Sequence, residues 1–231
     1  MLGESAMPLY KRYLEYLATV PAVELSLDVS RMNFSSAWLD SMEPEIQRAY
    51  AEMAELERGA IANPDENRMV GHYWLRAPQL APRAELRIEI EETRRRVQEF
   101  TARIHESSAF TEVLSIGIGG SALGPMFLAD ALGHAQRDRM RLHFFDNTDP
   151  DGMERVLAGL EGRLDRTLVL VISKSGGTPE THNGMKVAEA AFARAGVAFG
   201  PRAVAVTMPG SKLDAYAQAN GWLERFPMFD W

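Results

Sequence analysis

The sequence contains no cysteine among its 231 residues, which excludes disulfide bonds, catalytic thiolates and cysteine metal ligands. It also lacks any uninterrupted apolar run of the roughly 18 to 20 residues that a membrane-spanning helix requires. Residues 1–10 lack the charged-then-apolar order of a signal peptide. We therefore expect a soluble, cytoplasmic protein with no membrane partner.

An excess of basic residues is missing as well. The chain carries 25 lysines and arginines against 32 aspartates and glutamates, which gives a net charge of −7, and its longest basic run is the arginine triplet at 94–96. Proteins that bind nucleic acid through its phosphates present a basic surface. We therefore expect no nucleic-acid partner.

Helical periodicity is the main pattern of residues 1–109. Apolar residues recur at helical spacing within residues 44–60, where we expect a helix that ends near Gly59, and within residues 85–107. Proline, asparagine and aspartate at residues 63–67 predict a turn between these helices. The second helix places these residues on one apolar face: Leu86, Ile90, Val97, Phe100 and Ile104. Residues 1–109 are thus expected to form a helical N-terminal segment.

From residue 110 onward, short apolar runs alternate with helical stretches. Strands are expected at residues 112–118, 141–146, 167–173 and 202–207, with helices that begin near Ala122, Asp151, Thr178 and Ser211. The third run is apolar on both alternating faces, which is typical of a parallel strand covered by helices on either side. Residues 110–231 are thus predicted to form an α/β fold with a doubly wound, mostly parallel sheet.

A glycine-rich loop, Gly117-Ile118-Gly119-Gly120-Ser121, follows the first of these strands. Glycines let backbone N–H groups approach an anion at a helix N-terminus, and Ser121 adds a hydroxyl. A tight strand-to-helix turn without a ligand also fits this loop. Through Ala122 the loop spells G-x-G-x-x-A, and with Asp146 at the end of the next strand it also fits a dinucleotide fingerprint.

A second loop, Ser173-Lys174-Ser175-Gly176-Gly177-Thr178-Pro179-Glu180-Thr181, again lies between an apolar strand and a helix. Thr178 is the expected N-cap of that helix, with Pro179 as its first residue. The hydroxyls, glycines and lysine exceed what a cap needs and suit a phosphate monoester held by neutral donors. A capped turn whose serines face water is the alternative. The spacing departs from G-x-x-x-x-G-K-[ST], which disfavours a nucleoside triphosphate.

Both loops resemble the signature loops of the glucose-6-phosphate isomerase family. The similarity covers residues 115–125 and 173–181 and extends to residues 60–76 and 146–152, which resemble bacterial members. The resemblance implies that residues 110–231 form the first of two sugar-isomerase (SIS) domains, the second lying outside this chain.

The resemblance also implies a role for each candidate site residue. Ser173, Ser175 and Thr178 would bind the substrate phosphate through their hydroxyls, with the backbones of Lys174, Gly176 and Gly177 nearby, and Gly120 and Ser121 would line the sugar side. Animal members have bulkier residues where this chain has two glycines, which leaves the assignment of single donors open.

The activity implied by the resemblance is an aldose-ketose isomerisation without cofactor or metal. It interconverts glucose 6-phosphate and fructose 6-phosphate through a cis-enediol, in glycolysis and gluconeogenesis, and the complete protein is expected to be a homodimer. The family performs this chemistry with a glutamate, a histidine, a lysine and an arginine. All four lie beyond Trp231, so we expect no catalytic residue in this chain and no activity of the chain by itself.

The histidines of the chain do not replace the missing groups. None of them lies in a sequence context that supplies a paired carboxylate, so surface or packing roles are expected for His72, His105, His134, His143 and His182.

Two alternatives stay open. One is a stand-alone SIS module that binds a sugar phosphate without converting it, and the other is a nicotinamide-dependent oxidoreductase built on residues 117–122. The long N-terminal segment favours the isomerase. Residues 222–231 are rich in aromatics and lack the frayed polar tail common at a natural C-terminus, so we expect the chain to stop within a domain.

Overall fold

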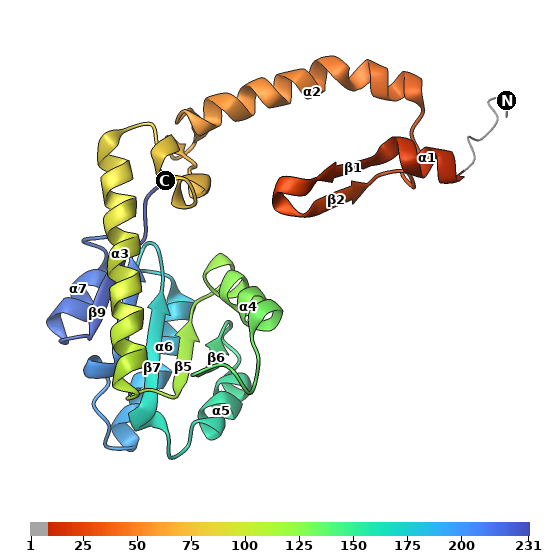
Figure 1. Cartoon of the computed structure of the whole chain (residues 1–231). Helices are drawn as coiled ribbons and strands as arrows, with labels where there is room; N and C mark the ends of the chain where they lie inside the picture. The colour runs from red at the N-terminus through yellow and green to blue at the C-terminus, as the bar shows by residue number, and fades with distance from the viewer. Residues whose placement is uncertain (1–8) are drawn as a thin grey trace. The chain divides into compact units, whose positions relative to one another are not determined.

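Helices and strands alternate along the computed structural model, which describes residues 9–231 (Figure 1). The chain divides into two units, Met1–Glu55 and Leu56–Trp231, and each is described by itself. Within residues 9–231, no helix is both long and apolar enough to cross a membrane. The sheet and both glycine-containing loops belong to the second unit.

The first unit combines helices with a short antiparallel hairpin. Its elements are α1 (Leu9–Tyr16), β1 (Leu17–Val20), η1 (Pro21–Val23), β2 (Leu25–Asp28) and most of α2 (Ser36–Glu57). The Arg12 guanidinium donates to the carbonyl of Ser30 at 2.7 Å and lies 4.6 Å from the ring centre of Phe34. These contacts hold the segment after β2 against α1. Ser30 is the one buried residue within residues 9–55, so this unit has almost no apolar core.

The second unit begins with short elements and one long helix. These are β3 (Ile61–Asn63), β4 (Arg68–Met69), η2 (His72–Leu75), η3 (Pro78–Leu80) and α3 (Ala84–Ser107). The predicted turn at residues 63–67 joins β3 to β4, and there Asn63 Oδ1 accepts the amide of Glu66 at 3.1 Å. On α3 the predicted apolar face is buried, except that Val97 is 41% exposed.

A five-stranded parallel sheet and the helices that connect its strands make up the rest of the chain. Its elements are β5 (Glu112–Ile116), α4 (Gly120–Leu132), β6 (Arg141–Phe145), α5 (Pro150–Gly159), η4 (Leu164–Arg166), β7 (Thr167–Ile172), α6 (Pro179–Arg194), η5 (Gly200–Arg202), β8 (Ala203–Thr207), α7 (Lys212–Ala219) and β9 (Glu224–Pro227). The strand order is β6-β5-β7-β8-β9, and all neighbouring strands are parallel. β6 and β9 are therefore the two edges of the sheet.

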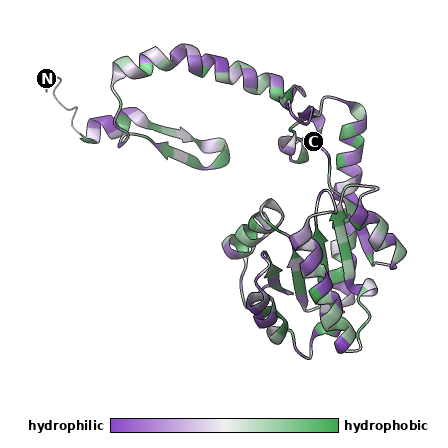
Figure 2. Ribbon diagram, turned by 180° about the vertical axis from the view of Figure 1, so that it is seen from behind, coloured by the Kyte–Doolittle hydropathy of each residue, from purple (hydrophilic) through white to green (hydrophobic). Residues whose placement is uncertain are grey.

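Helices cover both faces of the sheet. On one face, Phe100 and Ile104 of α3 pack on Leu168 of β7. On the other face, α5, α6 and α7 enclose the largest apolar cluster, which includes Phe192 of α6 and Val169 of β7. The strands are accordingly mostly hydrophobic in Figure 2, while the helices show purple on their outer sides. This arrangement confirms the predicted doubly wound α/β fold.

A third apolar cluster surrounds Trp74, which is fully buried. Its indole N–H donates to the carbonyl of Glu57 at 3.0 Å, and its ring centre lies 5.3 Å from that of Trp231. Gly71 lies so close that a Cβ there would be 1.9 Å from the Trp74 ring. The aromatic residues after β9 thus pack against the elements that precede α3.

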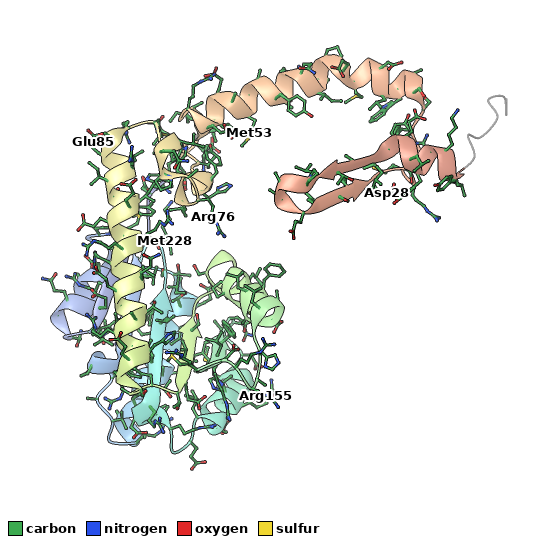
Figure 3. All side chains as sticks on the ribbon, viewed as in Figure 1. Asp28, Met53, Arg76, Glu85, Arg155 and Met228 are labelled. Carbon is green, nitrogen blue, oxygen red and sulfur yellow. The ribbon has the colours of Figure 1, made fainter. Side chains whose placement is uncertain are left out.

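Four features differ from the sequence-based expectations, and one of them is the antiparallel pair β3–β4, where only a turn was expected. The helix expected from residue 44 begins eight residues earlier, at Ser36, and contains Pro44 in its interior. The hairpin β1–β2 was not predicted, since four-residue strands carry little periodic signal. β9 was not predicted either; it extends the sheet beyond β8, and the amide of Met228, labelled in Figure 3, continues this ladder by donating to the Thr207 carbonyl at 2.9 Å.

Candidate functional site

The two predicted loops follow neighbouring strands, and both lie at the carboxyl end of the sheet. β5 and β7 pair in register, with Ile116 opposite Val171. After β5 the chain continues to β6 on one side, whereas after β7 it continues to β8 on the other side. The strand order therefore reverses between β5 and β7. The crevice at such a switch point is where open α/β sheets bind ligands.

The loop after β5 is held tightly against the first turn of α4. Gly119, the N-cap of α4, has a φ of +56°, a conformation that favours glycine. A Cβ on Gly117 would lie 2.9 Å from the Cβ of Ser121, so a side chain has no room there. Gly120 is exposed and Ser121 is half-buried, and both remain accessible to a ligand.

The loop after β7 brings two hydroxyls together. The Oγ of Ser173 and the Oγ1 of Thr178 lie 3.0 Å apart, and Ser173 is buried. Each hydroxyl has one rotatable donor, so the pair can turn both protons toward one anion. The Oγ of Ser175 instead accepts the amide of Gly177 at 3.2 Å within the loop.

The start of α6 adds donors that the protein leaves unused. Thr178 is the N-cap and Pro179 the first residue of α6, as predicted, yet the Thr178 side chain bonds to Ser173 and makes no capping bond. The first-turn amides of a helix have no acceptor within the helix, and its dipole favours an anion at this end. Thr181 is also buried, and its hydroxyl has no hydrogen-bond partner among the described residues.

Gly176 places the same loop directly on the start of α7. Its φ is +65°, and a Cβ on it would lie 2.5 Å from the backbone nitrogen of Leu213 and 2.9 Å from the Oγ of Ser211. Ser211 is the N-cap of α7, and its Oγ accepts the amide of Asp214 at 3.1 Å. Only glycine fits this contact between loop and helix.

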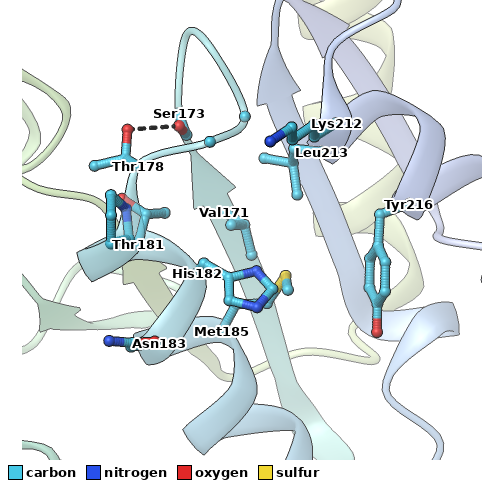
Figure 4. Close-up of a pocket in the computed structure, with 13 residues that line it drawn as sticks. Val171, Ser173, Thr178, Thr181, His182, Asn183, Met185, Lys212, Leu213 and Tyr216 are labelled. Atoms are coloured by element: carbon cyan, nitrogen blue, oxygen red, sulfur yellow. Dashed lines mark hydrogen bonds between the residues drawn. The ribbon is translucent and has the colours of Figure 1, made fainter.

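An open pocket of about 380 Å³ lies beside the loop, between α6 and α7 (Figure 4). Its apolar side is formed by Val171, Met185 and Leu213. In Figure 4 the His182 side chain and the Tyr216 ring face the space between the two helices.

The pocket takes in half of the predicted site residues. Ser173, Gly176, Gly177 and Thr178 line it, whereas Gly120, Ser121, Lys174 and Ser175 do not. Sequence analysis did not propose Lys212 or Tyr216, which line the pocket from α7. The position of Lys212 shortly after a predicted strand was an available signal, because ligands gather beyond strand ends.

Lys174 is held away from this pocket by Asp230. Its Nζ donates to the Asp230 carbonyl at 2.8 Å and lies 3.6 Å from the Asp230 carboxylate. Asp230 also pairs with Arg68 at 3.1 Å. The Lys174 ammonium is therefore engaged outside the pocket, although the residue belongs to the loop.

A cluster of Lys186, Glu189 and Tyr216 ties the two walls of the pocket together. The Tyr216 hydroxyl of α7 donates to Glu189 at 2.9 Å and accepts from the Lys186 ammonium at 2.7 Å. Desolvation by burial lowers the pKa of Lys186, but the hydrogen bonds with Glu189 and Tyr216 and the charge of Glu189 raise it above its ordinary value of 10.5. The cluster thus stabilises the protonated lysine.

Replacing Tyr216 with Phe is expected to lower the free energy of unfolding by about 1 kcal/mol at neutral pH, because two hydrogen bonds between α6 and α7 are lost. The contribution of Lys186 is fully present below its ordinary pKa of 10.5 and disappears as the pH rises through its raised folded-state pKa. Urea unfolding at pH 7 measures the first effect, and a series at increasing pH above 10.5 measures the second. A deficit of the variant that stays the same throughout this series would contradict the assignment.

His143 has a carboxylate partner in the structure that its sequence context did not indicate. Its Nε2 lies 2.8 Å from the Oε2 of Glu112, whose side chain is 3% exposed, and Arg163 approaches the same carboxylate at 3.4 Å. The pair joins β5 to β6, so its members lie far apart in sequence. Glu112 is the first residue of β5, so the pair lies at the opposite end of the strands from the two loops.

Comparisons with known proteins identify the family of this chain. The family model described as "Phosphoglucose isomerase" matches residues 33–214. Glucose-6-phosphate isomerases of Synechococcus elongatus and Geobacter sulfurreducens are 56% and 58% identical over 98% of this chain. The chain spans about 44% of the length of these curated relatives.

A solved structure shows the same fold. The crystal structure of a glucose-6-phosphate isomerase from Chlamydia trachomatis superposes with a TM-score of 0.83 at 26% identity, covering 98% of this chain and 44% of that one. The sheet, its strand-end loops and these similarities lead to one conclusion: the chain belongs to the phosphoglucose isomerase family.

Proposed function

We propose that this chain is the N-terminal portion of a glucose-6-phosphate isomerase, in which it binds the phosphate group of the substrate. The complete protein interconverts glucose 6-phosphate and fructose 6-phosphate as an aldose-ketose isomerase. The observation that carries the proposal is the Ser173–Thr178 hydroxyl pair at the uncapped start of α6, next to the switch point of the sheet. Family membership favours the isomerase over the dinucleotide enzyme that residues 117–122 also fit.

The chemistry explains why such a site belongs to this reaction. A proton moves between C2 and C1 of the open sugar, and the phosphate at the far end takes no part in that step. Binding energy from a remote, non-reacting group orients the substrate and lowers the barrier at the reacting carbons. Hydroxyls and amides can hold the phosphate without adding a base.

The remaining parts of the proposal concern the complete protein. Residues 110–231 form the first of two SIS domains, Gly120 and Ser121 face the sugar, and the catalytic groups come from the part that the relatives have in addition. The chain by itself then binds substrate without converting it. The complete enzyme is a cytoplasmic homodimer, which light scattering of the full-length protein tests.

A Ser173→Ala/Thr178→Ala variant of this chain is expected to bind fructose 6-phosphate at least about tenfold more weakly than the unchanged chain, because two donors to the anion are lost. Isothermal titration calorimetry measures this, with fructose as the ligand that lacks the phosphate. Thr19→Ala/Ser26→Ala is the matched control, since it removes another pair of facing hydroxyls, 3.3 Å apart on β1 and β2. Equal affinity of the two variants, or equal binding of fructose, would refute the phosphate site.

A further inference from the structure

The pocket beside the loop contains a charged residue, Lys212, in addition to the hydroxyl donors. Lys212 is its one lysine or arginine, and the described residues that line the pocket include no aspartate or glutamate. The chain as a whole carries a net charge of −7. Lys212 is thus the one permanently charged side chain among the residues that line the pocket.

The ammonium of Lys212 is available, whereas that of Lys174 is not. Lys212 is exposed and makes no hydrogen bond or ion pair among the described residues. Figure 4 shows its side chain extending from α7 toward the loop that begins at Ser173. The Lys174 ammonium donates to the backbone carbonyl of Asp230 at 2.8 Å, so the lysine within the loop motif is held outside the pocket.

Helix stability does not explain a lysine at this position. Lys212 is the first residue of α7, and a cation at the N-terminal end of a helix is repelled by the helix dipole. An acidic residue would suit the position better. The contact of Gly176 with Ser211 and Leu213 also brings the start of α7 directly against the anion-binding loop.

From this arrangement we propose that Lys212 is a further phosphate-binding residue, which supplies the positive charge that the hydroxyl donors of the Ser173–Thr181 loop lack. The inference rests on the phosphate site proposed above. It assigns the recognition of the phosphate to two groups of donors on different helices. Neutral donors from the loop and the start of α6 fix its position, and the ammonium from α7 favours the dianion.

The test compares Lys212→Met, Lys212→Arg and the unchanged chain in calorimetric titrations with fructose 6-phosphate at low and high salt. Lys212→Met is expected to bind about fivefold more weakly at low salt, and the difference is expected to shrink in about 0.5 M salt, because screening weakens charge pairs. Lys212→Arg keeps the charge and is expected to bind within about twofold of the unchanged chain. Lys11→Met, an exposed lysine of α1, controls for the change in net charge.

The outcomes separate this inference from the function on which it rests. If the folded, unchanged chain does not bind fructose 6-phosphate, the phosphate site itself is refuted and Lys212 with it. If the unchanged chain binds, Ser173→Ala/Thr178→Ala binds weakly and Lys212→Met binds normally at low salt, only the role of Lys212 is overturned. The same loss for Lys11→Met would also overturn it, because the effect would then come from net charge.

Discussion

A Gly176→Ala variant is expected to lose sugar-phosphate binding by about a hundredfold or more, because the loop can no longer reach its position. The new Cβ would lie 2.5 Å from the backbone nitrogen of Leu213, and that atom cannot move without displacing the start of α7. The φ of +65° adds strain for any residue with a side chain. Calorimetry with fructose 6-phosphate measures the loss.

Gly196→Ala is the matched control for Gly176→Ala. Gly196 has a φ of +69°, and nothing lies within 4 Å of the position of its Cβ. Its replacement therefore carries the strain of the left-handed conformation without a clash, and we expect a small loss of stability with unchanged binding. If Gly176→Ala binds as well as Gly196→Ala, the contact between loop and α7 does not shape the site.

A Trp74→Ala variant is expected to lose about 3 to 5 kcal/mol of unfolding free energy, the cost typical of deleting a fully buried aromatic side chain. Trp74 is 0% exposed, packs against Tyr73 and Trp231, and its indole satisfies the Glu57 carbonyl at 3.0 Å. Its removal leaves a cavity and an unpaired acceptor at once. Chemical denaturation followed by circular dichroism measures the change.

Trp38→Ala controls for the chemistry of the same substitution. Trp38 lies on α2 and is 50% exposed, so its truncation is expected to cost less than about 1 kcal/mol. A loss of under about 1 kcal/mol for Trp74→Ala as well would show that the cluster around Trp74 does not stabilise the second unit.

The sheet could be predicted from the sequence because its strands are short apolar runs separated by helices with recognisable starts. Thr178 is the N-cap of α6, as expected, and α7 begins directly after Ser211, near which a helix was expected. Because ligands bind beyond the carboxyl ends of strands in open α/β sheets, both loops could be predicted as candidate ligand sites. The switch point between β5 and β7 places those two loops together.

The pocket residues on α7 could not be predicted, because their position depends on which strands are neighbours in the sheet. Lys212 follows the strand after the one that carries the Ser173 loop, and no local pattern states that β8 lies beside β7. The contact between His143 and Glu112 could not be predicted either, because it depends on β6 and β5 being neighbours in the sheet. Pairings between distant segments depend on the order of the strands, which periodicity does not contain.

The short edge strand β9 has a consequence for how this protein behaves at high concentration. A sheet edge offers free backbone groups to which a strand of another molecule can add, and this is one route to aggregation. Pro227 has no N–H to offer, and Glu224 and Arg225 put charges along the same strand. Strand addition at β9 is therefore disfavoured by the residues that form it.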